Sequence, residues 1–151
     1  DILSMEDSGA SATMIFTDVG VVTTKSETAP GAARSLLNRL AAGKPELIVL
    51  ELGDGLLGAY GVAEILADAH LCPAFHTLVL AAGDGVAAWG AVELLRTEYG
   101  LRPAVITGPC TDNEAGVTIV ENRTRVKGVN ARLNGEELTQ AVLESLEAAH
   151  G

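Results

Sequence analysis

Residues 76–108 have the sequence HTLVLAAGDGVAAWGAVELLRTEYGLRPAVITG, which joins two apolar, strand-like runs through a helix-like middle. The first run, 76–82, leads through Gly-Asp-Gly into a stretch whose apolar residues recur at helical spacing. The second run is 102–108. A strand, a helix and another strand in about thirty residues predict a βαβ unit with parallel strands, whose crossover is right-handed in nearly all cases.

The same pattern also occurs earlier in the chain. Residues 49–61, VLELGDGLLGAYG, resemble residues 79–90, VLAAGDGVAAWG, in leading from an apolar run through Gly-Asp-Gly into small residues. We therefore expect two consecutive βα units, each with a Gly-Asp-Gly turn at the carboxyl end of its strand.

The strand-like runs alternate with helical patterns along the whole chain. Their apolar residues are nearly consecutive, which fits strands buried on both faces by helices. The sequence thus predicts a single α/β domain over 1–151: a three-layer sandwich, Rossmann-like or P-loop-like, with a mainly parallel sheet of about five strands and helices on both faces. Strands are expected at 12–18, 46–52, 76–82, 102–108 and 125–130, and helices at 29–44, 59–71, 89–101, 111–123 and 134–151.

Composition excludes several classes of function. The net charge is −10, and the sequence shows no cluster of basic residues beyond the local pair Arg123 and Arg125, so nucleic acid is not expected as a partner. No apolar run approaches the roughly 20 residues of a membrane span, and no membrane partner is expected. Two widely spaced cysteines, Cys72 and Cys110, match no metal spacing and favour a reducing, cytoplasmic location.

Candidate site residues follow from the rule that open α/β sheets bind ligands at the carboxyl ends of their strands. Glu51 and Asp54 follow the second expected strand and are predicted to bind Mg²⁺, because this ion prefers oxygen ligands. For Asp54 and Asp84 an ordinary Asp-Gly turn is the alternative. Asp18 follows the first strand, where a solvated loop is the alternative.

The loop after the fourth expected strand, from Thr107 to Asp112, is the remaining candidate for ligand contact. Thr111 and Glu114 have the spacing of a helix capping box, so capping is the alternative for the residues that follow. Cys110 precedes a helix and is either a thiol of lowered pKa or an incidental buried thiol. No catalytic residue can be assigned.

One short motif supports a different ligand. GDGLLG at 53–58, with Gly53, Gly55 and Gly58, matches the letters of the dinucleotide fingerprint between an expected strand and an expected helix. A Rossmann-like NAD(P)-binding domain is therefore an alternative. A non-catalytic assembly module, self-associating into a homo-oligomer through a sheet edge or helix faces, is another.

The runs IVLELGDG (48–55), 76–108 and TDNEAGVTIVENRTRVKGVN (111–130) together resemble the carboxyl portion of P-loop nucleoside triphosphatases of the dethiobiotin-synthetase and MinD-like class. The resemblance implies binding of ATP or GTP with Mg²⁺. Glu51 would be the Mg²⁺-associated carboxylate, Asp18 a switch-like residue facing the γ-phosphate, and the 107–112 loop a contact to the base.

Two departures from that class are visible. The Walker A loop, G-x-x-x-x-G-K-[ST], is absent, and Thr107 stands where many members carry Asn. We therefore expect the chain to be a fragment of a longer ATP-dependent ligase or triphosphatase, with the phosphate loop preceding Asp1. Because that loop supplies the N–H cradle and the lysine, the fragment alone should bind nucleotide poorly.

Overall fold

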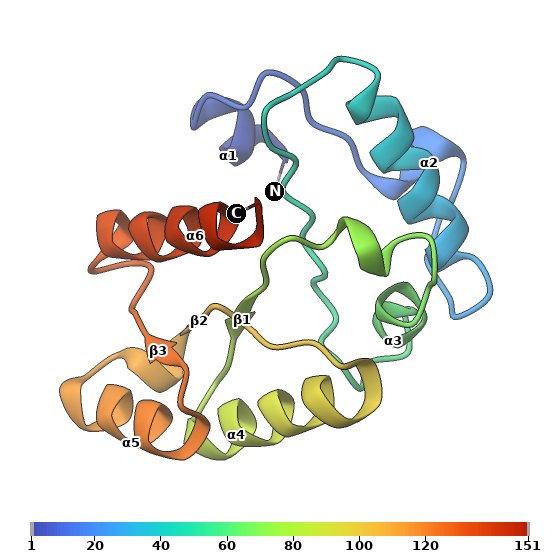
Figure 1. Ribbon diagram of the computed structural model, residues 1–151. Coiled ribbons are helices and arrows are strands. Elements are labelled where there is room, and N and C mark those ends of the chain that lie inside the picture. The colour runs from blue at the N-terminus through green and yellow to red at the C-terminus, as the bar shows by residue number, and fades with distance from the viewer. Residues whose placement is uncertain (1, 151) are drawn as a thin grey trace. The chain divides into compact units, whose positions relative to one another are not determined.

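The computed structural model describes residues 2–150 and is a mixed α/β structure (Figure 1). It forms two compact units, Asp1–Ala74 and Phe75–Gly151. Within the described residues, no helix is both long enough and apolar enough to cross a lipid bilayer.

The first unit is helical. Its elements are α1 (Ile2–Asp7), the 3-10 turns η1 (Phe16–Val19) and η2 (Cys72–Ala74), and the helices α2 (Ala29–Ala41) and α3 (Val62–Leu66). Helix α2 confirms the expected helix at 29–44, with Pro30 in its first turn, where the missing N–H costs nothing. Its buried residues are Ala29, Ala32, Ala33 and Leu36, and those of α3 are Val62, Ile65 and Leu66.

Small residues let α2 and α3 approach closely. Gly61 precedes α3 with φ of +89°, and a Cβ at this position would lie 2.4 Å from the Cβ of Ala29. Arg34 of α2 also pairs with Asp68, which follows α3. Asp68 in turn accepts the backbone N–H of Leu71 at 3.1 Å. Local bonds to Asp68 and the left-handed Gly61 explain why the helix expected over 59–71 is only five residues long.

The second unit contains a parallel sheet of β1 (Val79–Ala81), β2 (Val105–Thr107) and β3 (Lys127–Gly128), in the order β1-β2-β3. Val79 lies opposite Val105, and Val105 lies opposite Lys127. The expected strands at 76–82, 102–108 and 125–130 are thereby confirmed in shorter form. The central strand β2 forms the buried centre of the sheet, since Val105 and Ile106 have no exposed surface.

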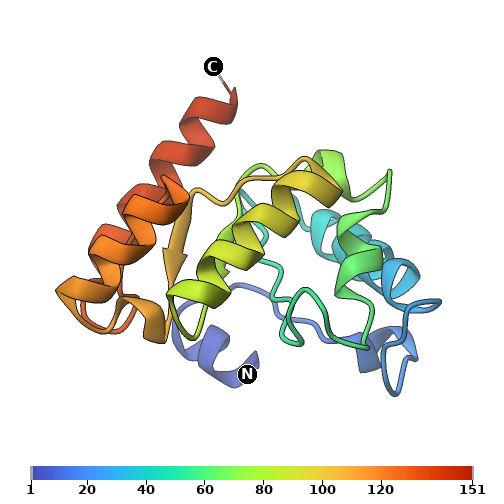
Figure 2. The same cartoon turned by 90° about the horizontal axis from the view of Figure 1, so that it is seen from below.

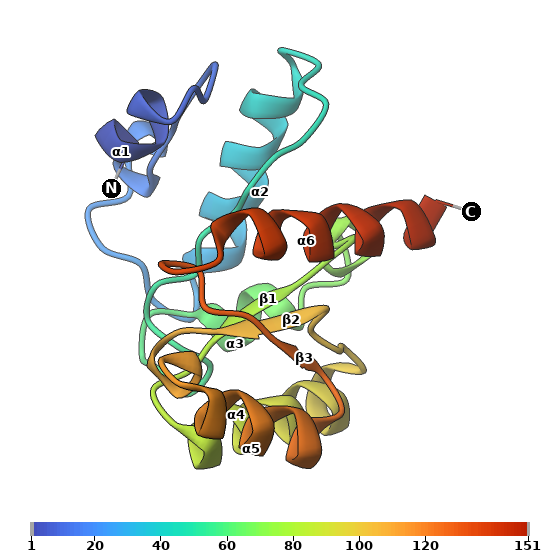
Figure 3. The ribbon, with the colours of Figure 1, turned by 90° about the vertical axis from the view of Figure 1, so that its left-hand side faces the viewer.

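The helices of this unit lie on two faces of the sheet. After β1 the chain forms α4 (Gly85–Leu94) and continues as the π-type turn η3 (Leu95–Tyr99); after β2 it forms the 3-10 turn η4 (Pro109–Thr111) and α5 (Glu114–Thr124). Figures 2 and 3 show α4 and α5 side by side on one face, with α6 (Gly135–His150) across the other. Both strand-to-strand connections therefore cross on one face, as a sheet of consecutive parallel strands requires.

Two of the expected strands are wrong. The run 46–52 is irregular, and Leu47 and Val49 are 51% and 75% exposed. A strand needs a hydrogen-bonded neighbour as well as apolar residues, and this run has none among the described residues. The run 12–18 ends in the 3-10 turn η1, because the Asp18 carboxylate accepts the N–H of Ile15 at 2.8 Å and replaces a ladder bond. The described sheet thus has three strands instead of about five.

Candidate functional site: the carboxyl edge of the sheet

The predicted site residues fall in both units. Asp18, Glu51, Gly53, Asp54 and Gly55 belong to the first unit, whereas Asp84, Thr107 and Asp112 belong to the second. Asp84 follows β1, Thr107 is the last residue of β2 and Asp112 follows β2, so the structure brings all three to the carboxyl edge of one sheet, as the strand-end rule requires.

At the end of β1, Asp84 caps helix α4. Its Oδ1 accepts the backbone N–H groups of Val86 and Ala87, both at 2.8 Å. The Asp-Gly turn expected as the alternative for Asp84 is therefore wrong: Gly85 begins α4 without a positive φ, and Asp84 serves as the helix N-cap. Because Asp84 already occupies these donors, the start of α4 offers them to no anion.

At the end of β2, the Thr107 side chain and the Gly108 backbone contact the segments that follow the neighbouring strands. Thr107 is buried, and its Oγ1 accepts the N–H of Ala131 at 3.0 Å. Gly108 has φ of +92°, and a Cβ there would lie 2.8 Å from the carbonyl oxygen of Ala82. Thr107 thus holds the segment that follows β3 against the end of β2.

Cys110 is buried beside this turn. Its Sγ donates to the carbonyl oxygen of Thr107 at 3.3 Å, and burial raises the pKa of the thiol. The hypothesis of a lowered pKa is therefore wrong, and Cys110 behaves as a small core residue. The capping box predicted at Thr111 and Glu114 is also wrong. Asn113 is the N-cap of α5, and its Oδ1 accepts the N–H of Gly116 at 2.9 Å.

At the end of β3, Asn130 organises the edge. It is 7% exposed, and its Nδ2 donates to Oδ1 of Asp112 at 2.9 Å and to the carbonyl oxygen of Thr111 at 3.2 Å. Its Oδ1 accepts the N–H groups of Arg132 and Leu133, both at 3.0 Å. One buried amide therefore fixes the Asp112 loop and the connection to α6 together. Sequence reasoning missed Asn130; the available signal was a polar amide directly after a short apolar run, VKGVN.

A hollow of about 620 Å³ lies beside Asn130. It follows β3 from the η4–α5 loop to the start of α6 and contains the carboxylates of Asp112, Glu114, Glu121 and Glu137. Its one cation, Lys127, pairs with Glu137 at 3.0 Å, and this bond together with one from Asn134 lowers the pKa of Glu137. The full lining is Thr111, Asp112, Asn113, Glu114, Val117, Thr118, Glu121, Lys127, Gly128, Val129, Asn130, Leu133, Asn134 and Glu137.

The chemistry of this hollow favours ligands that donate hydrogen bonds. Carboxylate oxygens accept hydroxyl and amino protons, and the side-chain amides of Asn113 and Asn134 can both donate and accept. Asp112 is exposed, and only its Oδ1 is engaged within the described residues. An excess of carboxylates repels phosphate groups. The arrangement therefore suits a sugar or a base better than a phosphate.

The predicted magnesium residues lie in a loop of the first unit. Oδ2 of Asp54 accepts the N–H of Tyr60 at 3.2 Å, Gly55 has φ of +75°, and a Cβ on Gly58 would overlap the Asp54 carboxylate. Asp54 thus closes its own loop, and Glu51 is exposed. Within residues 2–150, no three His, Cys, Asp or Glu side chains gather in a way that could hold a metal ion.

The other two predictions for the first unit concern Asp18 and the glycine motif at 53–58. The Asp18 carboxylate closes the η1 turn, and its carbonyl oxygen accepts a bond from Arg39 of α2 at 2.9 Å. The letters GDGLLG follow irregular chain instead of a strand, and α3 begins only at Val62. The strand-to-helix context that a dinucleotide fingerprint needs is therefore missing at 53–58.

Comparisons with known proteins give no match: no protein-family model, no curated protein and no solved structure is significantly similar to the chain.

Proposed function

We propose that the carboxyl edge of the second unit binds the nucleoside part of a nucleotide, ATP or GTP. The observation that supports this most is the clamp by Asn130, which fixes the Asp112 loop beside a hollow rich in hydrogen-bond acceptors. A buried, fully bonded amide gives such a loop a single geometry before a ligand arrives. The resemblance of 76–108 and 111–130 to the P-loop class assigns a base contact to the same loop.

Size and chemistry support a nucleoside. The hollow, at about 620 Å³, lies within the range of small-molecule sites. The free Oδ2 of Asp112 is suited to a ribose hydroxyl or an exocyclic amine, and the apolar surfaces of Val117 and Leu133 are suited to the face of a base. In this proposal the fold is a three-layer, P-loop-like sandwich built on the three-stranded parallel sheet, with α4 and α5 on one face and α6 on the other.

The proposed contacts to the phosphates and to Mg²⁺ lie outside this hollow. Its carboxylates repel the phosphates, and Asp84 occupies the first N–H donors of α4. The resemblance assigns Mg²⁺ to Glu51 and the γ-phosphate to Asp18, and these assignments stay predictions. The chain then contributes the nucleoside contacts of an ATP-dependent ligase or a triphosphatase, and weak binding is expected for a site without a phosphate loop.

The test is a titration of the ¹⁵N-labelled protein with adenosine, guanosine and ribose 5-phosphate, followed by NMR. We expect one nucleoside to produce saturable shifts at 107–134, in the millimolar range, and ribose 5-phosphate to produce weaker ones. Asp112→Asn keeps an acceptor for Asn130 and removes the charge, so it should weaken nucleoside binding about threefold to tenfold. Glu98→Gln, an exposed acid of η3, is the matched control and should bind as the wild type does.

Two outcomes would overturn the proposal. One is the absence of saturable shifts with either nucleoside, and the other is equal weakening by Asp112→Asn and Glu98→Gln. Binding of NADH with shifts confined to 53–58 would instead favour the dinucleotide alternative.

A further inference from the structure

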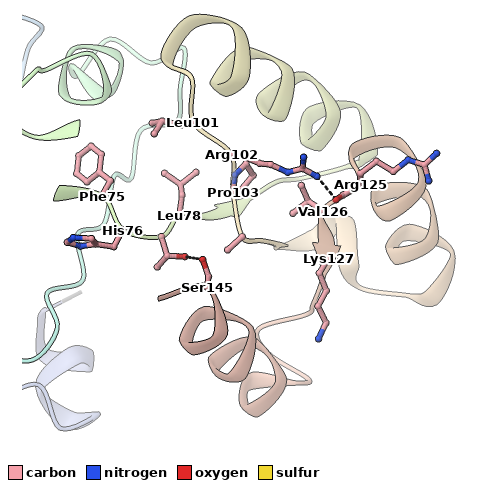
Figure 4. Close-up of a pocket in the computed structure, with 12 residues that line it drawn as sticks. Phe75, His76, Leu78, Leu101, Arg102, Pro103, Arg125, Val126, Lys127 and Ser145 are labelled. Carbon is pink, nitrogen blue, oxygen red and sulfur yellow. Dashed lines mark hydrogen bonds between the residues drawn. The ribbon is translucent and has the colours of Figure 1, made fainter. Parts of the chain in front are cut away.

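A second groove lies at the opposite, amino-terminal edge of the same sheet. It has a volume of about 380 Å³ and is lined by the residue before each strand, Leu78, Ala104 and Val126, and by Ser145 of α6 (Figure 4). All of its lining residues belong to the second unit. The nucleoside proposal uses none of this surface except Lys127, which reaches both hollows.

The end of the groove away from Lys127 is mainly apolar. Phe75, Leu78 and Leu101 lie there in Figure 4, with the imidazole of His76 beside Phe75. Between the two ends, Thr77 donates a hydrogen bond from its Oγ1 to Oγ of Ser145 at 2.9 Å, which ties the chain before β1 to α6. The apolar end thus has a wall fixed by a bond between distant parts of the sequence.

The other end of the groove is basic. Arg102, Arg125 and Lys127 lie on the same side of Figure 4, where their exposed side chains point in different directions, and the Arg102 Nη2 donates to the carbonyl oxygen of Arg125 at 2.7 Å. The Arg125 guanidinium has no hydrogen bond or ion pair within the described residues, whereas Lys127 pairs with Glu137. Three of the chain's ten Lys and Arg residues therefore line one groove.

The charge of this groove is opposite to that of the protein. The chain carries 20 Asp and Glu residues and a net charge of −10, yet none of those carboxylates lines the groove. Lys127 is paired with Glu137 from outside the groove, whereas the guanidinium groups of Arg102 and Arg125 have no carboxylate partner within the described residues, so an anion in the groove supplies a counter-ion for these two arginines. The planar guanidinium of an arginine fits a carboxylate or a phosphate through paired N–H groups.

We propose that this groove binds a small amphiphilic anion, with its carboxylate or phosphate head at Arg102, Arg125 and Lys127 and its apolar body against Phe75, Leu78 and Leu101. The volume of about 380 Å³ matches a ligand with a short hydrocarbon or aromatic body. Neither end suffices alone: the exposed cations are screened by water and salt, and the apolar surface is small. Affinity therefore requires both parts in one molecule.

The test uses four probes that separate the two parts: hexanoate, hexyl phosphate, 1-hexanol and acetate. Binding is followed by ¹⁵N NMR shifts at 75–78, 101–104 and 125–127. We expect one of the two amphiphilic anions to bind at least about fivefold more tightly than 1-hexanol and acetate. The tighter of hexanoate and hexyl phosphate identifies the head group.

Variants then locate the head. Arg125→Asn combined with Lys127→Gln removes two charges, and Asn tolerates the left-handed backbone of residue 125, whose φ is +59°. This pair should weaken the anionic probe about tenfold and leave 1-hexanol binding unchanged, which also shows that the groove is still folded. The control is Arg96→Gln with Arg132→Gln, which makes the same charge change outside the groove.

The proposal is overturned if neither amphiphilic anion saturates, if 1-hexanol binds as tightly as they do, or if the control pair weakens the anion as much as the groove pair. Equal loss of anion and 1-hexanol binding in the groove variant also counts against it, because the cations would then act only through the fold.

Discussion

Asn130 and Asp112 join the ends of β3 and β2 across the carboxyl edge of the sheet, with Nδ2 of Asn130 donating to Oδ1 of Asp112 at 2.9 Å. They are 18 residues apart in the chain. Since the same amide makes three further bonds, to Thr111, Arg132 and Leu133, it stabilises the loop that the proposed nucleoside site requires.

Replacing Asn130 by Ala should destabilise the protein by about 2–4 kcal/mol, because four hydrogen bonds are lost at a buried position. Urea unfolding measures this change. Asn122→Ala, at an exposed position of α5, should change stability by less than about 0.5 kcal/mol. A similarly small effect at residue 130 would contradict the role assigned to the clamp.

Gly108→Ala should cost about 1–3 kcal/mol or more, because the backbone is in the left-handed region and the new Cβ would meet the Ala82 carbonyl oxygen at 2.8 Å. Gly90→Ala is the matched substitution, since Gly90 is helical and has open space around it. It should stabilise α4 by about 0.5–1 kcal/mol. Thermal unfolding of both variants compares the two glycines, and equal effects would refute the close approach at Gly108.

Asp84→Ala should destabilise the protein by about 0.5–2 kcal/mol through loss of the α4 cap, and Asp84→Asn should recover most of that loss. Chemical denaturation gives the free energies. If Asp84 is only a cap, neither substitution changes magnesium or nucleotide binding by calorimetry. A binding defect in Asp84→Asn with unchanged stability would show a direct ligand role.

The Arg34–Asp68 pair predicts a pH dependence. Burial alone would raise the pKa of Asp68, but bonds from the N–H groups of His70 and Leu71 and from Arg34 outweigh it and leave the pKa below its usual value of 3.8. A carboxyl whose pKa is lowered on folding contributes stability above its unfolded pKa, and this is lost as the pH falls through the folded value.

The melting temperature of the wild type should therefore fall more steeply below pH 3.8 than that of Asp68→Asn. Glu98→Gln, which removes an exposed carboxyl instead, should follow the wild-type curve. Parallel curves for wild type and Asp68→Asn would mean that the pair contributes nothing measurable.

In the full-length protein, Glu51→Gln should abolish magnesium-dependent nucleotide binding if the resemblance to P-loop proteins assigns this residue correctly. Isothermal calorimetry with ATP and GTP, each with and without Mg²⁺, measures the effect, and Glu46→Gln, an exposed acid five residues earlier, is the control. Unchanged magnesium dependence in Glu51→Gln would remove the assignment and leave the nucleoside site to be judged by Asp112→Asn alone.

The sequence by itself determined the order of elements from residue 76 onward. Strand, helix and strand at 76–108 depend on local features, namely apolar runs and the helical spacing of Val92 and Leu95; the cap at Asp84, which starts α4 four residues before the expected helix, was interpreted as a turn. These features each span only a few residues, so they can be recognised in the amino-acid sequence. The same holds for α2, with Pro30 at its start.

Only the tertiary structure decided what depends on distant partners. The run 46–52 has the apolar composition of a strand but no ladder neighbour among the described residues, and its Leu47 and Val49 are exposed. The composition of a segment indicates how much apolar surface it can bury. It does not indicate whether another strand lies about 5 Å away to form hydrogen bonds with it. For this reason the sheet has three described strands and not about five.

The side chains that line the two grooves show the same limit of prediction from sequence. Arg102, Arg125 and Lys127 are isolated or locally paired in the sequence, yet parallel strands bring them to one edge, because every parallel strand presents its amino end on the same side. Asn130 reaches Asp112 at the other edge by the same geometry. The sequence determined which charges and amides the chain carries, and the parallel pairing of strands decided which of them meet.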